Sequence, residues 1–229
     1  MTQQHIHISR KMAINLGICG ILGSLVLFAG DMLFYYANDS TDFILNMGNA
    51  SSERIIASGI CALFSAWLYT LASGQVYYAL QPTKKWLRLL TFFSFAAVMI
   101  TYGVVHGAYI AIATSAKNAV QLGMAPNTFT ELAIQANDAL RLIAYIPFGI
   151  FTILFIPLVW MEQTKYPKWI ILFSPVIPFL LNNTIVNSLE GEWKTIIGGG
   201  YLNLILTLFF SATTFSLWRA KENSSHNRS

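Results

Sequence analysis

Long apolar stretches alternate with short polar ones along the whole chain. A helix needs about 20 apolar residues to cross the hydrocarbon core of a bilayer. Stretches of that order predict helices over residues 13–36, 52–80, 86–114, 129–160, 169–187 and 197–218. Ser51 is the expected N-cap of the second helix, and Thr128 and Glu131 have capping-box spacing at the start of the fourth. The pattern therefore predicts an all-α, polytopic membrane protein, a bundle of six transmembrane helices.

The basic residues orient this predicted bundle, because Lys and Arg are enriched in the cytoplasmic loops of membrane proteins. Most of the 14 basic residues fall on the side of the two termini. They are Arg10, Lys11, Lys84, Lys85, Arg88, Lys165, Lys168, Arg219, Lys221 and Arg228. We therefore expect both termini to be cytoplasmic (N-in/C-in). The expected organisation is a tail over residues 1–11, a transmembrane domain over 12–218 and a disordered tail over 219–229.

Composition agrees with lipid as the main solvent of the chain. Of its 229 residues, 55% are hydrophobic and 10% are charged, whereas soluble domains have about 25% charged residues. The net charge of +4 does not indicate a nucleic-acid partner, because the basic residues lie at the ends of apolar stretches and form no continuous patch. Cys19 and Cys61 lie toward opposite sides of the predicted bundle, so we expect neither a disulfide nor a metal site. The expected partner is the lipid bilayer.

Polar residues gather at one depth of the predicted bundle. Asp31 lies inside the apolar run from Leu25 to Tyr36, and an ionisable residue in a membrane segment is by default a functional candidate. At 1.5 Å per residue, Asp31 lies roughly 7–8 Å inside the outer end of its helix. The candidate ligand-binding residues are Asp31, Arg54, His106, Tyr109, Asp138, Arg141, Asn183 and Asn203. They predict a polar cavity in the outer third of the bilayer, facing the extracytoplasmic side.

Other polar positions favour helix packing rather than a site. Ser, Thr and Gly recur at steps of three and four on several predicted helices, and in lipid such stripes mark close helix contacts. An ion pair of Asp31 with Arg54 or Arg141 would likewise serve packing alone. The inner halves of the helices look uniformly apolar, which counts against a transport path. Only His106 lies inside the bundle, so neither a bis-histidine haem nor a three-histidine zinc site is expected, and we expect no cofactor.

Three classes of function remain open at this point. The first is a membrane protein that binds a small or lipid-like ligand in the polar pocket. The second is a membrane-embedded enzyme acting on a lipid or isoprenoid-like substrate, with Asp31 and His106 as the candidate acid/base pair. The third is a structural protein whose polar cluster only holds helices together. The motifs of common membrane hydrolases are absent from the sequence, so it does not decide whether the protein is an enzyme.

Five segments together resemble an uncharacterised family of bacterial six-helix membrane proteins. The segments are Gly30-Asp-Met-Leu-Phe-Tyr-Tyr36, Glu53-Arg-Ile-Ile-Ala-Ser-Gly59, the region from Leu68-Tyr69 to Tyr77-Tyr78, His106-Gly-Ala-Tyr109 and Gly198-Gly-Gly-Tyr-Leu-Asn203. One departure is Val105 before His106, where the family tends to have tyrosine. The resemblance implies a multi-pass protein of the bacterial inner membrane, and it brings no activity, substrate or cofactor.

Overall fold

The computed structural model describes residues 8–37 and 40–226, with side chains as far as Ala220. Within these ranges the chain is helical apart from short connections, and it contains no strand. The α-helices are α1 (Arg10–Tyr35), α2 (Phe43–Asn49), α3 (Ser52–Ala79), α4 (Lys85–Gln121), α5 (Glu131–Trp160), α6 (Val176–Asn187) and α7 (Gly191–His226). Two 3₁₀ helices, η1 (Pro126–Phe129) and η2 (Lys168–Phe173), precede α5 and α6.

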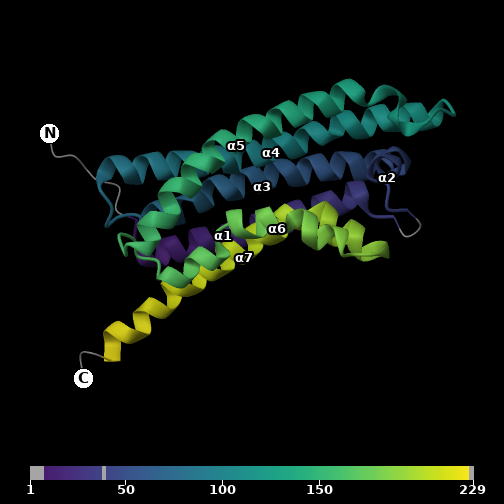
Figure 1. Ribbon diagram of the computed structural model, residues 1–229. Coiled ribbons are helices and arrows are strands. Elements are labelled where there is room, and N and C mark those ends of the chain that lie inside the picture. Colours follow the sequence, from purple (N-terminus) through teal and green to yellow (C-terminus); the bar gives the residue numbers. More distant parts are fainter. Residues whose placement is uncertain (1–7, 38–39, 227–229) are drawn as a thin grey trace.

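The long helices form an elongated bundle (Figure 1). α1 packs against α3 and α7, α3 packs against α4, and α4 packs against α5. The start of α1 and the end of α7 lie at the same end of the bundle (Figure 1). Five helices, α1, α3, α4, α5 and residues 191–220 of α7, are long and apolar enough to cross a membrane. The fold is therefore all-helical and consistent with a multi-pass membrane protein.

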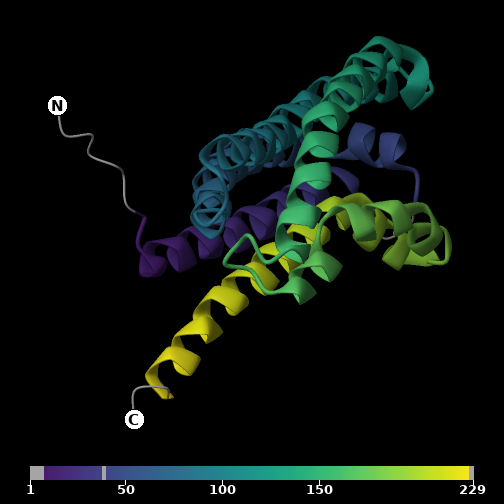
Figure 2. The same cartoon turned by 60° about the vertical axis from the view of Figure 1, so that its left-hand side comes forward.

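The fifth predicted helix is divided in the structure. Residues 168–173 form η2, Ser174 and Pro175 interrupt the helix, and α6 has only 12 residues. Proline lacks the backbone N–H that an uninterrupted helix needs, so Pro175 is a natural break point. The two pieces lead back from the end of α5 toward the start of α7 (Figures 1 and 2). Five helices, and not the six expected, are thus individually long enough to span.

Several helix boundaries differ from the predicted ones. The predicted polar loop before residue 52 contains α2, which is anchored where Asn46 Nδ2 donates to the Tyr35 carbonyl at 2.8 Å. α4 continues to Gln121, well past the expected end at residue 114. α7 begins at Gly191 and reaches His226, so residues 219–226 are helical where a disordered tail was predicted. Residues 1–7 and 227–229 lie outside the described part of the chain.

The two predicted N-terminal caps have different outcomes. Ser51 caps α3 as expected, because its Oγ accepts from the Arg54 amide at 3.3 Å. The capping box of Thr128 and Glu131 does not form. Thr128 Oγ1 instead donates to the Ala125 carbonyl, and α5 begins at Glu131 without a side-chain cap. The intervening η1 turn separates the two residues into different helices, which removes the capping geometry.

Small residues pack α1 closely against α3. Ser58 Oγ donates to the Gly30 carbonyl at 2.7 Å, and Ser65 Oγ donates to the Gly23 carbonyl at 2.8 Å. Both serines are buried, and lipid tails offer no hydrogen-bond acceptor, so the hydroxyl groups are satisfied by the carbonyls of the neighbouring helix. The packing interpretation of these two serines is therefore confirmed.

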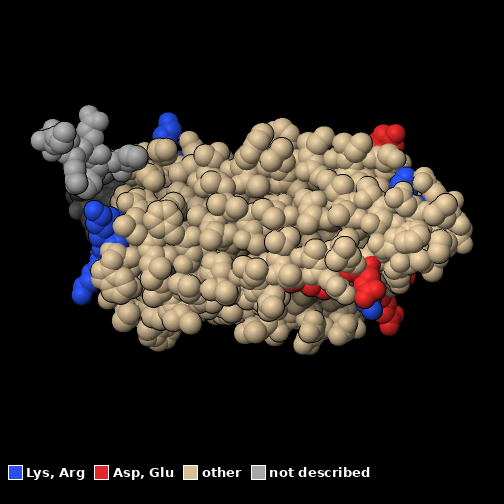
Figure 3. All heavy atoms as spheres, turned by 90° about the horizontal axis from the view of Figure 1, so that it is seen from above, with Lys and Arg blue, Asp and Glu red and all other residues tan. Residues whose placement is uncertain are grey.

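Charges occupy the two ends of the bundle. On the face shown in Figure 3, basic side chains gather at one end and most acidic ones toward the other, with a wide uncharged belt between. We call the first the basic end. Four tryptophans that are between 39% and 64% exposed lie in helices that begin or finish there: Trp86, Trp160, Trp169 and Trp218. Tryptophan and basic residues are both enriched at membrane–water interfaces, so their coincidence is typical of the edge of a bilayer.

Candidate functional site

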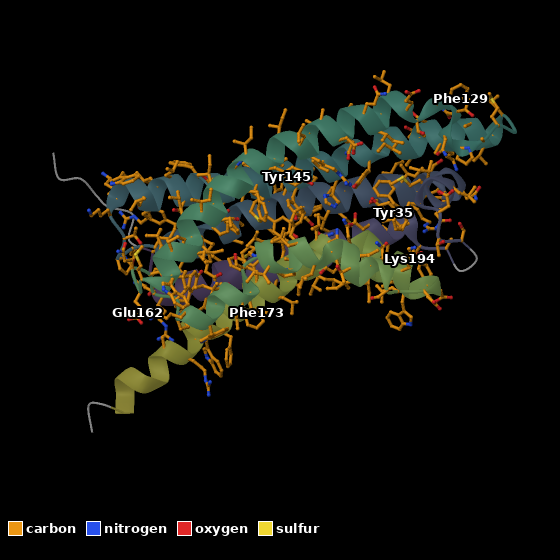
Figure 4. All side chains as sticks on the ribbon, in the orientation of Figure 1. Tyr35, Phe129, Tyr145, Glu162, Phe173 and Lys194 are labelled. Carbon is orange, nitrogen blue, oxygen red and sulfur yellow. The ribbon has the colours of Figure 1, made fainter. Side chains whose placement is uncertain are left out.

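A cavity of about 390 Å³ lies between α4 and α5 on one side and α1, α6 and α7 on the other, with α2 at its outer edge. Its size falls within the roughly 300–1,000 Å³ of small-molecule sites. Tyr35 and Tyr145 line it. In Figure 4, Tyr35 and Lys194 lie toward the end opposite Glu162 and Phe173, with Tyr145 between. The cavity thus extends from the middle of the bundle toward the end opposite the basic end.

The floor of this cavity is a contact between Asp31 of α1 and His106 of α4. His106 Nε2 lies 3.4 Å from Asp31 Oδ2, and both residues are more than 90% buried. The other ring nitrogen, Nδ1, lies 2.8 Å from the Tyr102 carbonyl, which can only accept a hydrogen bond. A neutral imidazole has a single N–H, and here that N–H is at Nδ1 and donates to the Tyr102 carbonyl. An attractive contact between Nε2 and the carboxylate therefore requires one further proton shared by Asp31 and His106.

Asn203 of α7 completes the floor. Its Nδ2 donates to Asp31 Oδ2 at 2.6 Å, and its side chain is 1% exposed. Within the described residues, Asn203 Oδ1 has no hydrogen-bond partner. A buried acceptor left unsatisfied costs about 1–3 kcal/mol. Asn203 lines the cavity, but Oδ1 itself is covered by neighbouring atoms, so a hydrogen-bond donor in the cavity would reach this oxygen only after a small shift of the side chains around it.

Tyr109 connects the floor with the arginine of α5. Its ring lies edge-on to the His106 ring at a centroid distance of 5.4 Å and an angle of 88°. The Arg141 guanidinium carbon lies 5.3 Å from the Tyr109 centroid, in the range of a cation–π contact. Arg141 is itself exposed, lines the cavity and forms no ion pair with Asp31 within the described residues.

Asp138 and its neighbour Asn137 lie on the α5 wall. Asp138 is exposed, lines the cavity and forms no ion pair within the described residues. Asn137 is buried, and its Nδ2 donates to the Val105 carbonyl of α4 at 2.9 Å. Sequence reasoning missed Asn137, although its position directly before Asp138 and four residues before Arg141 places it near the same face of the helix.

Six of the eight residues predicted from the sequence line the cavity. They are Asp31, His106, Tyr109, Asp138, Arg141 and Asn203. Arg54 and Asn183 do not. Arg54 Nη2 donates to the Met32 and Tyr36 carbonyls at 3.3 and 2.8 Å, where it caps the C-terminus of α1. Asn183 is exposed, and its neighbour Asn182 faces the cavity instead.

The rest of the cavity wall is largely apolar and aromatic. Phe179 of α6 meets α5 through two rings, with centroid distances of 5.8 Å to Tyr145 and 5.5 Å to Phe148. All three line the cavity, and Tyr145 is 49% exposed. These ring contacts join α5 and α6 at the cavity wall. No group of three or more His, Cys, Asp or Glu residues in the described ranges could hold a metal ion.

The inner half of the bundle is not uniformly apolar, contrary to expectation. Gln75 is fully buried, donates to Thr214 Oγ1 at 2.9 Å and accepts from Thr213 Oγ1 at 3.0 Å. Thr207 Oγ1 donates to Ser24 Oγ at 2.8 Å. Between these two groups the Phe210 ring packs onto Gly20. The hydrogen bonds therefore join α1, α3 and α7 on both sides of the Phe210 ring.

A family model matches residues 4–220, nearly the whole chain. The chain belongs to the family of unknown function DUF6796. Membership confirms the expectation of an uncharacterised family, and the matched range contains every residue of the cavity. No curated protein and no solved structure is similar enough to the chain to count as a match. The DUF6796 family brings no activity with it, so function has to be argued from the cavity.

Proposed function

We propose that this protein is a multi-pass protein of the bacterial inner membrane that binds an amphiphilic, lipid-like ligand in the cavity. The observation that carries the proposal is the unpaired Oδ1 of buried Asn203, beside the Asp31–His106 pair, at the floor of a cavity whose remaining wall is largely apolar and aromatic. A ligand with a polar, hydrogen-donating head and an apolar tail matches both parts.

In this proposal the chain crosses the bilayer six times, with η2 and α6 together forming the fifth crossing. Both termini and the basic end face the cytoplasm. The distribution of basic side chains supports that orientation, because cytoplasmic loops carry the excess of Lys and Arg. The cavity then opens toward the extracytoplasmic half of the membrane. Its tail-binding part is the aromatic wall between α5 and α6.

In this proposal the polar head of the ligand binds at the floor of the cavity. Asn203 Oδ1 accepts from a hydroxyl or amine of the head, and the shared proton of Asp31 and His106 adjusts to the donor or acceptor presented there. Arg141 and Asp138, three residues apart on α5, offer one charge of each sign to the outer part of the head. The charged walls are thus balanced, which favours a neutral or zwitterionic head over a strongly charged one.

A cavity-filling substitution tests the proposal. Ala144 lines the cavity, and Ala144→Trp should fill it; the adjacent Ile143 is 62% exposed and lies outside the cavity, so Ile143→Trp is the matched control. Lipids retained by the detergent-purified protein are extracted and compared by mass spectrometry. We expect one class of lipid to be depleted in Ala144→Trp alone. Retention of the same lipids by both variants would contradict the proposal, as would unchanged retention in Asp31→Asn and His106→Ala.

One observation favours a second function, a membrane-embedded enzyme acting on a lipid or isoprenoid-like substrate. His106 Nε2 lies 3.4 Å from Asp31 Oδ2 and both residues are buried, so a proton shared between them would give the arrangement that a general acid/base pair needs. The two functions differ in the fate of the ligand. If the lipid extracted from wild-type protein differs chemically from the lipid held by Asp31→Asn, the protein converts its ligand.

A further inference from the structure

A second recess lies at the basic end of the bundle, and its lining shares no residue with that of the cavity. It is an open cleft of about 1140 Å³ between the 162–169 turn with η2 and the last turns of α7. The end of α7 leaves the other helices there (Figures 1 and 2), so one wall of the cleft is not covered by the rest of the chain. Glu162 and Phe173 mark the opposite wall in Figure 4.

The cleft combines an apolar groove with a basic rim. Leu208, Ala212 and Phe215 form the α7 side of the groove, and Leu208 and Phe215 are 54% and 44% exposed. Lys165, Lys168 and Arg219 provide cations from both walls. The apolar groove suits an acyl chain, and the basic rim suits a charged group at the end of that chain.

The rim carries a net positive charge. Among the described side chains that line the cleft, Glu162 is the only acidic one, and its Oε1 lies 2.9 Å from Lys168 Nζ. Lys165 donates to Gln81 Oε1 at 2.8 Å, a neutral partner, so it keeps its charge. The Arg219 guanidinium lies 5.4 Å from the Phe215 centroid, over the groove. Three cations against one carboxylate are complementary to an anion.

The depth of the cleft in the membrane indicates which kind of anion would bind there. Trp169 lines the cleft, Trp160 is the last residue of α5, and Trp218 lies in α7 between the cleft residues Ser216 and Arg219. Exposed tryptophans mark the depth of the lipid headgroups. Basic pockets between helices on the cytoplasmic side bind anionic headgroups. We infer that this cleft is a binding site for one anionic phospholipid, with its phosphate between Lys168 and Arg219 and one acyl chain along Leu208 and Phe215.

Native mass spectrometry of the full-length protein in detergent tests the inference. The probes are phosphatidylglycerol and phosphatidylcholine of the same acyl chains, added separately. The paired variant Lys168→Gln with Arg219→Gln is compared with Lys84→Gln with Lys85→Gln, which removes two exposed charges outside the cleft. We expect the first pair to lose roughly fivefold of phosphatidylglycerol retention for each removed cation, and the control pair to resemble wild type.

A steric variant separates a lipid from free phosphate. Ser211 lines the groove, and Ser211→Trp should block the acyl chain without changing any charge. We expect it to lose phosphatidylglycerol, and inorganic phosphate alone to leave the thermal unfolding of wild type unchanged. Three results would overturn the inference: equal loss in the two charge-removing pairs, equal retention of phosphatidylcholine and phosphatidylglycerol by wild type, or stabilisation by inorganic phosphate as large as that by the lipid.

Discussion

Asn203 donates a hydrogen bond of 2.6 Å to Oδ2 of Asp31 and thereby joins α7 to α1 at the floor of the cavity. His106 approaches the same oxygen from α4, at 3.4 Å. One carboxylate oxygen thus links three helices, while Asn203 Oδ1 stays unpaired within the described residues. Helix packing accounts for the link between the three helices, but it does not account for the unpaired oxygen of Asn203. The cluster therefore has a structural role and an unused hydrogen-bonding capacity at the same time.

Replacement of Asp31 should remove a pH dependence of stability. At low pH the shared proton makes the Asp31–His106 contact attractive. As the pH rises and the proton leaves, a carboxylate faces an imidazole lone pair, so wild-type stability falls. Asp31→Asn cannot carry this charge, and its thermal unfolding in detergent should vary less between about pH 5 and 9.

Asp138→Asn is the control for this experiment. It removes a carboxylate that also lines the cavity but is not paired with His106. We expect it to retain the wild-type pH profile. An unchanged profile in Asp31→Asn would show that the two side chains do not share a proton.

Arg54 should prove structural although the sequence suggested a ligand-binding role. Its guanidinium caps the C-terminus of α1 through the Met32 and Tyr36 carbonyls. Arg54→Met keeps the side-chain length and should cost about 1–2 kcal/mol of stability, because a cation at a helix C-terminus is lost. Lipid retention measured by mass spectrometry should stay at the wild-type level. Loss of lipid retention with unchanged stability would show that Arg54 takes part in ligand binding.

Lys117 has a corresponding role on the neighbouring helix. Its Nζ donates at 2.7 Å to the carbonyl of Ala50, the C-cap of α2. Arg54 and Lys117 are two of the few basic residues away from the basic end. Both neutralise helix C-termini there, which gives a local reason for their departure from the overall charge bias.

Phe179 should control entry from the bilayer. Phe179→Ala removes both ring contacts to Tyr145 and Phe148, each contributing about 0.5–1.5 kcal/mol. We expect a fluorescent phospholipid to exchange with the detergent-solubilised protein about tenfold faster than in wild type. The adjacent Leu180 is 73% exposed and does not line the cavity, so Leu180→Ala should exchange at the wild-type rate. Equal rates in all three proteins would place the entry elsewhere.

The sequence predicts the depth of the polar residues better than their partners. Asp31, His106 and Asn203 are polar positions in apolar runs, so their helical positions locate them without any knowledge of packing. Which of them touch depends on helix order and rotation. α3 lies against α1 and contributes nothing to the cavity lining, so Arg54 reaches the end of α1 and not Asp31. One-dimensional periodicity does not contain that information.

The broken fifth segment and the added α2 show a different limit. The hydrophobic pattern over residues 169–187 is continuous, and only the effect of Pro175 on the backbone divides it into η2 and α6. α2 has seven residues and is held by Asn46, which bonds to backbone carbonyls of Tyr35 and Ser40. Such short helices depend on tertiary anchors, since isolated ones are unstable in water.

The close packing of α1, α3 and α7 in the inner half should be sensitive to a single methyl group. A Cβ on Gly17 would overlap the Gln75 amide and the Thr214 hydroxyl, which bond to each other at 2.9 Å. Gly17→Ala should therefore lower stability by about 1–3 kcal/mol, despite the better helix propensity of alanine. Gly149→Ala is the matched control, because its Cβ meets no heavy atom within 4 Å. Thermal unfolding of Gly17→Ala at or above the temperature of Gly149→Ala would contradict this interface.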